Sequence, residues 1–337
     1  MTDPTDTSGP GVYAVGVDLG GTNLKVALVE RTLGILQRSS VETAAEDGPE
    51  RVLDQMADGI RAVVASLPDG ETLAGIGVGV PGAVTLDRTT VRKPPNLPGW
   101  SEVHVANALV LRLLDVPLGG PVLVENDANV AGLGSAFYGA GKAFGTFVMV
   151  TLGTGVGGAI LVDGRLFRGA TGAAGEIGHV SIDYEGPLSR GGVAGAVEAY
   201  LGQRFLSRHA RYQLMNRTTA LHATWGDDLL DITPHALHAA AEAGDAAARD
   251  VLAWAGHKLG VALGSVVNLL DIRKIVVGGG VSAADTFLLD PAREALARFV
   301  MPAARDGLEL VRETRGNDVA LLGAARLAFE HSEDRAV

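Results

Sequence analysis

Two glycine-rich turns carry the residues of this sequence that could bind a phosphate group. The stretch DLGGTN at residues 18–23 and the stretch GTGVGG at residues 153–158 each follow a short apolar run. Glycine lets backbone N–H groups approach an anion without interference from a Cβ atom. Asp18, at the end of the first run, could hold Mg²⁺ directly or through water. Either turn alone is also compatible with a plain β-hairpin.

Known phosphate-binding loops of other classes do not fit these turns. No Gly-Lys-Ser/Thr follows either of them, so neither is a Walker A loop. A strand rather than a helix is expected after each, unlike the dinucleotide-binding pattern. The triple glycine at residues 278–280 follows a third apolar run and could let a flat base lie against the backbone, or it could be a simple strand-to-helix turn.

A possible proton acceptor lies in the stretch Glu125-Asn126-Asp127, which ends a short apolar run and opens a helical pattern. At the edge of a sheet, where open α/β folds bind ligands, Asp127 could accept a proton from a hydroxyl that attacks phosphorus. The alternative is a helix N-cap, a position that Asp and Asn favour. The residues themselves leave both interpretations open.

Further polar residues could bind the hydroxyl groups of a sugar. Glu176 and His179 lie in a glycine-rich stretch, and a carboxylate or an imidazole can bind two adjacent hydroxyls. Each could also be merely exposed. Glu198 is near the start of a predicted helix, where it would complement the helix dipole. Asn96, in PPNLPGW, would by default be a turn residue.

The elements that must position these residues alternate between strands and helices, which indicates an α/β fold. Apolar runs predict strands over 12–18, 24–30, 35–43, 73–80, 122–125, 147–152, 159–163 and 274–277. Helical spacing predicts helices over 49–67, 101–114, 127–138, 197–212, 234–243 and 245–270, one from about 283 and a last one from about 321 to 331. Sliding residues 15–30 by 133 positions onto 148–163 aligns two strand–turn–strand segments without a gap, which points to a duplicated fold.

Composition limits the classes of protein that remain. A chain of 337 residues suits two domains, and 47% hydrophobic residues suit a globular core. The net charge of −11, with no basic run, argues against nucleic-acid binding. The sequence has no cysteine, and it has neither a signal-peptide core nor an apolar run long enough to span a membrane. We therefore expect a cytoplasmic protein that uses no membrane and no nucleic acid.

Taken together, the motifs resemble the ROK family (repressors, open reading frames, kinases), especially its glucokinase-like members, over nearly the whole chain. The matching stretches are DLGGTN at 18–23, VGVPGAV at 78–84, PPNLPGW at 94–100, VENDANVAGLGSAFYGAG at 124–141, TLGTGVGGAILVDGRLFRGATGAAGEIGH at 151–179 and IVVGGGVS at 275–282. The resemblance implies a two-domain actin-like, hexokinase-type ATPase fold of duplicated ribonuclease H-like domains with a cleft between them. It also implies a tail over 1–11, a small domain over 12–123 plus 318–337, and a large domain over 124–317.

The resemblance also implies roles for individual residues. Asp127 would be the catalytic base, and Asp18 would help hold Mg²⁺. The sugar would contact Asn96, Asn126, Asp127, Glu176, His179 and Glu198. ATP would contact Asp18, Gly20, Gly21, Thr22, Asn23, Gly153, Thr154, Gly155, Gly157, Gly278, Gly279 and Gly280.

The chain departs from the family pattern in two places. Many members carry a cysteine-rich zinc loop after the GEIGH segment, but here Ser189, Gly191 and Ala196 stand where the three cysteines would be. A structural zinc site needs about four ligands, so we expect no bound zinc. The family's repressors carry a helix-turn-helix ahead of the first phosphate motif, and we expect none here because that motif begins at Asp18.

The expected activity is therefore phosphorylation of glucose to glucose 6-phosphate by MgATP, a step of glycolysis. The alternatives are a kinase for N-acetylmannosamine, N-acetylglucosamine, fructose, mannose or allose, or a non-catalytic sugar or nucleotide sensor. Polyphosphate remains open as the phosphoryl donor. The resemblance further implies a homodimer or homotetramer.

Overall fold

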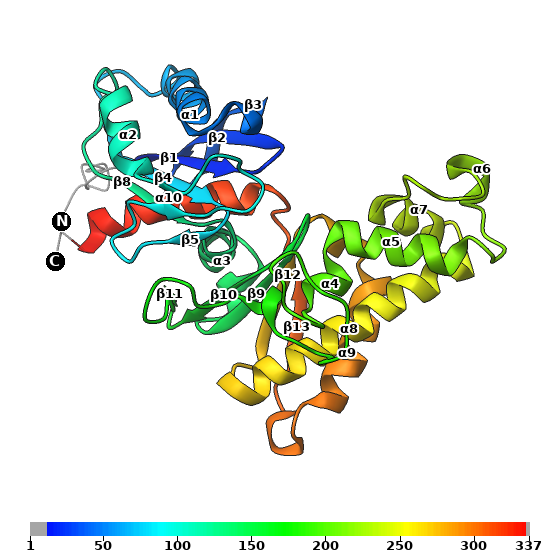
Figure 1. The fold of residues 1–337 in the computed structure, drawn as a ribbon. Helices are drawn as coiled ribbons and strands as arrows, with labels where there is room; N and C mark the ends of the chain where they lie inside the picture. Colours follow the sequence, from blue (N-terminus) through cyan, green and yellow to red (C-terminus); the bar gives the residue numbers. More distant parts are fainter. Residues whose placement is uncertain (1–11, 335–337) are drawn as a thin grey trace. The chain divides into compact units, whose positions relative to one another are not determined.

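The computed structural model describes residues 12–334, which form two compact units (Figure 1). The first unit runs from residue 12 to Lys142 and adds Gly164–Ala174 and residues 317–334, and the second contains Ala143–Asp163 and Gly175–Gly316. Residues 124–142, which the sequence analysis assigns to the large domain, therefore pack within the first unit. The tail expected over 1–11 lies outside the described residues.

Five strands form the main sheet of the first unit: β1 (Tyr13–Leu19), β2 (Asn23–Glu30), β3 (Gly34–Glu42), β4 (Leu73–Val80) and β8 (Val122–Asn126). Their order is β3-β2-β1-β4-β8. The first three strands are antiparallel neighbours, whereas β1, β4 and β8 run parallel. Every residue of β4 is buried, as expected for a central strand covered on both faces.

Helices cover both faces of this sheet: α1 (Pro49–Val64), α2 (Val105–Arg112), α3 (Asp127–Tyr138) and α10 (Asp318–Asp334). Strand residues alternate between the faces, so Val15 and Val17 join the apolar cluster of α1 and α2, whereas Ala14 joins that of α10. On the second face α10 packs closely on α3, because Gly323 has no Cβ to collide with the Val130 carbonyl. The smaller elements of this unit are β5 (Ala83–Val84), β6 (Val91–Arg92), β7 (Glu102–Val103), β11 (Arg165–Leu166) and the 3₁₀ turn η1 (Ala45–Asp47), and a further 3₁₀ turn, η2 (Ala140–Ala143), spans the boundary between the units.

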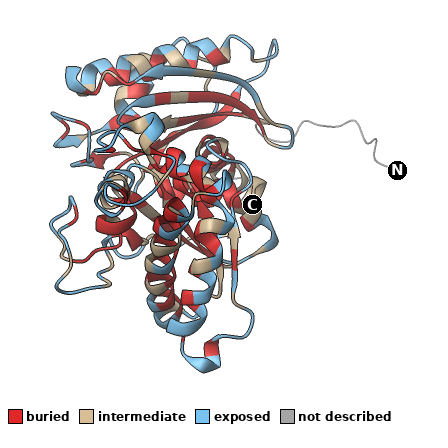
Figure 2. Cartoon of the chain, turned by 90° about the vertical axis from the view of Figure 1, so that its right-hand side faces the viewer, coloured by how far each residue is buried: buried red, intermediate tan, exposed pale blue. Residues whose placement is uncertain are grey.

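The sheet of the second unit contains β9 (Phe147–Leu152), β10 (Val156–Val162), β12 (Lys274–Gly278) and β13 (Glu309–Arg312) in the order β10-β9-β12-β13. Its helices are α4 (Glu198–Leu201), α5 (Gln203–Leu214), α6 (His222–Trp225), α7 (Pro234–Glu242), α8 (Ala246–Leu270) and α9 (Thr286–Phe299), and its 3₁₀ turns are η3 (Ile177–His179), η4 (Gly280–Ala284) and η5 (Pro302–Ala304). Alternate residues of β9 and β12 face the apolar sides of α8 and α9. Figure 2 colours buried residues red, and they concentrate on the strands and on one side of the helices.

The duplication predicted from the sequence is present in the structure. β9 is antiparallel to β10 and parallel to β12, just as β1 is antiparallel to β2 and parallel to β4. Shifted by 133 positions, β1 and β2 would cover residues 146–152 and 156–163, which matches β9 and β10 to within one residue at each end. Each unit therefore presents a glycine turn at the equivalent end of its sheet.

Three predicted helices begin later than expected or are broken in the structure. The helix expected over 101–114 begins only at Val105, because residues 102–103 pair with β6 as β7. The helix expected over 197–212 is broken at Gly202, whose ψ of 137° is extended. The helix expected from about 283 begins at Thr286, after η4. Among residues 12–334, no helix is both long enough and apolar enough to cross a bilayer.

Candidate active site

The first glycine turn joins β1 to β2 and is closed by its own backbone. The Gly20 amide donates to the Asn23 carbonyl at 2.9 Å, and the Thr43 hydroxyl donates to the Gly20 carbonyl at 2.8 Å. Gly21 and Thr22 form an exposed tip that lines a cavity of about 330 Å³. Three carboxylates also line that cavity: Glu42, Glu46 and Asp47. A phosphate group would be repelled there unless it arrived with a cation.

Asp18 lies at the base of this turn and has a perturbed acidity. Burial raises the pKa of its carboxyl, and Lys25, whose Nζ is 3.3 Å from Asp18 Oδ2, opposes that rise. One carboxylate beside a phosphate-binding turn fits Mg²⁺, which is usually held by one or two carboxylates together with substrate phosphates. Asp18 is therefore the residue of this turn that could hold the metal of a bound MgATP.

Strand register places Asp18 and Asp127 at the same edge of the first sheet. Asp18 pairs with Gly79, and Gly79 pairs with Glu125 on the next parallel strand. Two strand spacings separate β1 from β8, a distance of roughly 10 Å. Because the carboxyl ends of parallel strands meet at one edge, both aspartates emerge on the side of the sheet where open α/β folds bind ligands.

The residue that caps helix α3 decides between the two interpretations left open for residues 126 and 127. Asn126 is the N-cap of α3, and its Oδ1 accepts from the Ala128 and Asn129 amides at 2.9 and 3.2 Å. Asp127 is the first helical residue, half-buried, with Oδ1 accepting from the Ala128 amide at 2.8 Å. The capping function therefore belongs to Asn126.

Asn96 lies against the first glycine turn. A Cβ atom placed on Gly21 would lie 3.0 Å from the Asn96 Cβ and 3.3 Å from its carbonyl oxygen. Asn96 itself is exposed and has a positive φ of 64°, a conformation that asparagine tolerates. The first unit therefore brings together Asp18, the turn at 20–23, Asn96, Asn126 and Asp127.

A buried charge cluster surrounds Glu125, two residues before Asp127, and no sequence pattern predicted it. Glu125 is fully buried, with Arg168 Nε 2.7 Å and Arg88 Nε 3.3 Å from its Oε2. Neither contact has hydrogen-bond geometry, so these are ion pairs rather than directed bonds. The other oxygen, Oε1, accepts from the Asn126 amide and from Asn129 Nδ2, both at 3.0 Å. Glu125 belongs to the stretch VENDANVAGLGSAFYGAG at 124–141. No sequence pattern links it to Arg88, 37 residues earlier, or to Arg168, 43 residues later.

The second glycine turn, between β9 and β10, is held by a helix of the same unit. The Gly153 amide donates to the Gly155 carbonyl at 3.0 Å, and the Gln203 amide donates to the Gly153 carbonyl at 2.9 Å. Glu198, the first residue of α4, lies beside Gly155, and its Oε2 accepts from the Val156 amide at 3.4 Å. The break at Gly202 allows this arrangement, because α4 ends there and α5 starts in a new direction.

Glu176, the N-cap residue of η3, and His179, its last residue, are both exposed, and η3 packs on β10. The buried Ile177 and Gly178 anchor that 3₁₀ turn, with Gly178 close to the Val156 carbonyl. Glu176 Oε2 lies 3.8 Å from His179 Nε2. Since η3 contacts the start of β10, where Glu198 also binds, the three polar residues are grouped around the second glycine turn.

The triple glycine lies at the same sheet edge as the second turn. Gly278 pairs with Thr151 across parallel strands. Gly279 has a positive φ of 83° and packs on the backbone of Leu152, where no side chain would fit. The second unit therefore brings together the turn at 153–157, the triple glycine, Glu176, His179 and Glu198.

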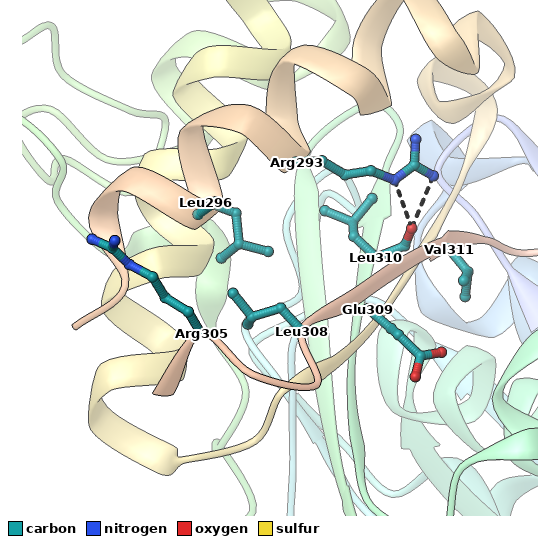
Figure 3. A pocket seen from close by; sticks show the side chains of 8 residues that line it. Arg293, Leu296, Arg305, Leu308, Glu309, Leu310 and Val311 are labelled. Carbon is teal, nitrogen blue, oxygen red and sulfur yellow. Dashed lines mark hydrogen bonds between the residues drawn. The ribbon is translucent and has the colours of Figure 1, made fainter. Parts of the chain in front are cut away.

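A separate cavity of about 380 Å³ lies between α9 and β13, away from all of these residues (Figure 3). Its lining is mostly aliphatic and includes Leu296, Leu308 and Leu310. Arg293 donates to the Leu310 carbonyl through Nε at 3.1 Å and Nη2 at 2.9 Å (Figure 3). Because this guanidinium donates to a backbone carbonyl on the open edge of β13, that carbonyl is not available to pair with another strand.

The paired units, each with a glycine turn at the carboxyl edge of a mixed sheet, define the two-domain actin-like ATPase fold. The ROK family model matches residues 14–331, and the chain belongs to that family. The chain is 32% identical to a glucokinase from Thermotoga maritima, covering 95% of this chain and 98% of that protein. It is also 26% identical to a xylose repressor from Caldicellulosiruptor bescii, over 84% of this chain and 69% of the repressor.

A solved structure is similar along nearly its entire length. It is a ROK family glucokinase from Streptomyces griseus in complex with glucose and AMPPNP, with a TM-score of 0.80 and 32% identity, and the match covers 94% of this chain and 99% of that one. The predicted fold class and family are thereby confirmed.

Proposed function

We propose that this protein is a sugar kinase that transfers the γ-phosphoryl group of ATP to a hexose, with glucose as the preferred acceptor and its 6-hydroxyl as the attacking group. The observation that carries the proposal is the register of β1, β4 and β8, which puts Asp127 and Asp18 at one sheet edge beside a glycine turn. A carboxylate that accepts the proton of the attacking hydroxyl and a second that holds Mg²⁺ are acidic groups that kinases use for phosphoryl transfer. The similarity to glucokinases supports glucose as the acceptor.

In the proposed reaction, Asp127 accepts the proton of the attacking hydroxyl. The sugar oxygen forms a bond to the γ-phosphorus, the bond from that phosphorus to the β–γ bridging oxygen breaks, and ADP leaves with the electron pair. The ion pairs of Glu125 and the cap formed by Asn126 hold the first turn of α3 in place, so the Asp127 carboxylate is oriented before substrate binds. Magnesium held by Asp18 would neutralise charge on the phosphates.

The remaining residues would bind the two substrates. Glu176, His179 and Glu198 offer two carboxylates and an imidazole around one turn, a set suited to pairs of sugar hydroxyls. The turn at 153–157 and the triple glycine share a sheet edge, so phosphates and an adenine base could bind along that edge. Asn96 would approach the sugar from the first glycine turn.

Replacement of the proposed base tests this function. We expect Asp127→Asn to lower kcat by about 10²–10⁴-fold, because the amide keeps the hydrogen bond from the Ala128 amide but cannot accept the proton. The measurement is a coupled ADP-release assay with glucose. Asp69→Asn, at an exposed carboxylate of the same unit, is the matched control and should behave as the wild type. Near-normal turnover in Asp127→Asn would remove Asp127 from this role.

A panel of acceptors separates glucose from the alternative sugars. The same assay would compare glucose with mannose, fructose, allose, N-acetylglucosamine and N-acetylmannosamine, each with ATP and with polyphosphate. We expect the highest kcat/KM for glucose with ATP. Sugar binding without phosphorylation of any acceptor would contradict the kinase proposal and favour a sensor.

A further inference from the structure

The imidazole of His179 has two close neighbours in its own unit, Glu176 and Gly191. Its Nε2 faces Glu176, with 3.8 Å between Nε2 and Oε2. The Cε1–Nδ1 edge of the ring faces Gly191, where an added Cβ would lie only 2.8 Å from His179 Cε1 and 3.3 Å from Nδ1. The ring can therefore occupy this position only because residue 191 has no side chain.

A hydrogen-bonded turn holds Gly191 against the ring. The buried Ser189 donates its amide to the Val193 carbonyl at 3.0 Å and accepts from the Gly192 amide at 3.0 Å through its own carbonyl. Its hydroxyl oxygen accepts from the Val193 amide at 3.3 Å. These bonds join residues 189–193 into a compact turn without any metal ligand.

The turn is tied to the rest of the unit at its base. The Gly195 amide donates to the Pro187 carbonyl at 2.8 Å, and the Ile182 amide donates to the Gly195 carbonyl at 2.9 Å. The Val197 amide then donates to the Val180 carbonyl at 3.0 Å, next to His179. Gly191 and His179 are thus two points of one hydrogen-bonded loop, so their separation is set by the loop backbone.

Gly191 is needed for space rather than for backbone conformation. Its φ lies outside the left-handed region, so the backbone at this position accepts alanine without strain. The atoms that alanine would meet belong to a ring whose side chain is 40% exposed and can move away. A methyl group here would therefore reorient the imidazole at little cost in stability.

We propose that Gly191 is a positioning residue that, with the turn at 189–193, orients His179 for binding of sugar hydroxyls. This inference rests on the proposed function of the site and adds the device that orients one of its groups. With the ring in this position, Nε2 lies on the side of Glu176, so the imidazole and the carboxylate are presented together to adjacent hydroxyls.

Kinetics of Gly191→Ala test the inference. We expect the KM for glucose to rise about three- to tenfold, the loss of roughly one hydrogen bond, with a smaller change in kcat. Gly145→Ala is the matched control, because that glycine belongs to the same unit, has no atom near its would-be Cβ and should leave the KM unchanged. The double variant Gly191→Ala/His179→Ala should match His179→Ala alone, since both changes act on one side chain.

Nuclear magnetic resonance gives a second readout that does not depend on activity. In protein labelled with ¹³Cε1-histidine, the Cε1–H resonance of His179, assigned by its loss in His179→Gln, should shift in Gly191→Ala and not in Gly145→Ala. An unshifted resonance, an unchanged glucose KM in an active protein, or additive effects in the double variant would each overturn the inference. A wild type inactive on every sugar would overturn the proposed function instead, and the resonance alone would then decide whether Gly191 orients the ring.

Discussion

A residue that is suited to binding a cation can lower the stability of the fold, and Asp18 is the clearest case in this site. Its carboxyl is largely removed from water at the end of a buried strand, and Lys25 compensates only in part. Desolvation disfavours the charged form, so the pKa of the Asp18 carboxyl is raised above its ordinary value. A charged carboxylate at this position therefore costs stability, which suits a residue retained for binding a cation.

That cost predicts a stabilising but inactivating variant. A carboxyl with a raised folded-state pKa contributes stability below its unfolded pKa and loses that contribution as pH rises through the folded pKa. We therefore expect Asp18→Asn to raise Tm at pH 7 by about 2–4 °C, and the difference to shrink as the pH is lowered towards 4. Thermal unfolding followed by circular dichroism across that pH range measures it.

The companion measurement is kinase activity, which Asp18→Asn should largely abolish because an amide is a poorer ligand for Mg²⁺. Asp69→Asn again serves as the control and should change neither quantity. A lower Tm for Asp18→Asn at pH 7 would contradict the sign derived from burial.

At the scale of elements, the position of Asp127 depends on how α3 is attached to β8. Glu125 is the penultimate residue of that strand and a fully buried carboxylate, and its charge and polarity are offset by Arg168, Arg88, Asn129 and the Asn126 amide. Arg168 also donates to the Thr85 and Leu86 carbonyls at 3.0 and 2.8 Å, which joins the segment 164–174 to the loop after β5. One guanidinium thus supports both a strand end and a loop.

Removal of that guanidinium should be strongly destabilising. We expect Arg168→Ala to lower the free energy of unfolding by about 3 kcal/mol, because it leaves a buried carboxylate with poorer charge compensation. Urea unfolding followed by far-UV circular dichroism measures the change. Arg165→Ala removes an exposed arginine three residues earlier and should cost far less. Equal effects of the two variants would argue that Glu125 is compensated without Arg168.

At the scale of the whole molecule, the lack of cysteine changes how the loop after η3 must be stabilised. The chain has no cysteine, and within residues 12–334 no three His, Asp or Glu residues gather closely enough to hold a metal ion. Backbone hydrogen bonds around Ser189 and Gly195 hold the loop instead. The absence of structural zinc remains a prediction that elemental analysis can test.

We expect the purified, tag-free protein to contain substoichiometric zinc, because tetrahedral zinc needs about four ligands and His179 supplies one. Inductively coupled plasma mass spectrometry measures the content. Treatment with a chelator should also leave Tm unchanged, since no folding energy depends on the metal. One zinc per chain, or a marked loss of Tm with the chelator, would contradict this prediction.

Much of the fold could be predicted because its signals are local. Short aliphatic runs ended by glycine predicted β1, β4, β9 and β12, and the match at an offset of 133 residues predicted the duplication. Helix boundaries were less predictable where tertiary contacts decide them. Residues 102–103 have helical neighbours but pair with β6, and Gly202 breaks a helix so that α4 can lie against the second glycine turn.

The sequence by itself determined the residue types of the site, the two glycine turns and the family, because each motif is a continuous stretch of residues and the order and spacing of the motifs can be read directly. Only the tertiary structure decided that Asn126 is the cap, that Glu125 lies buried between two distant arginines, and that Gly191 faces the imidazole of His179. Those facts depend on contacts between segments far apart in sequence or on the path of a loop, and neither leaves a periodic signal that composition or spacing could show.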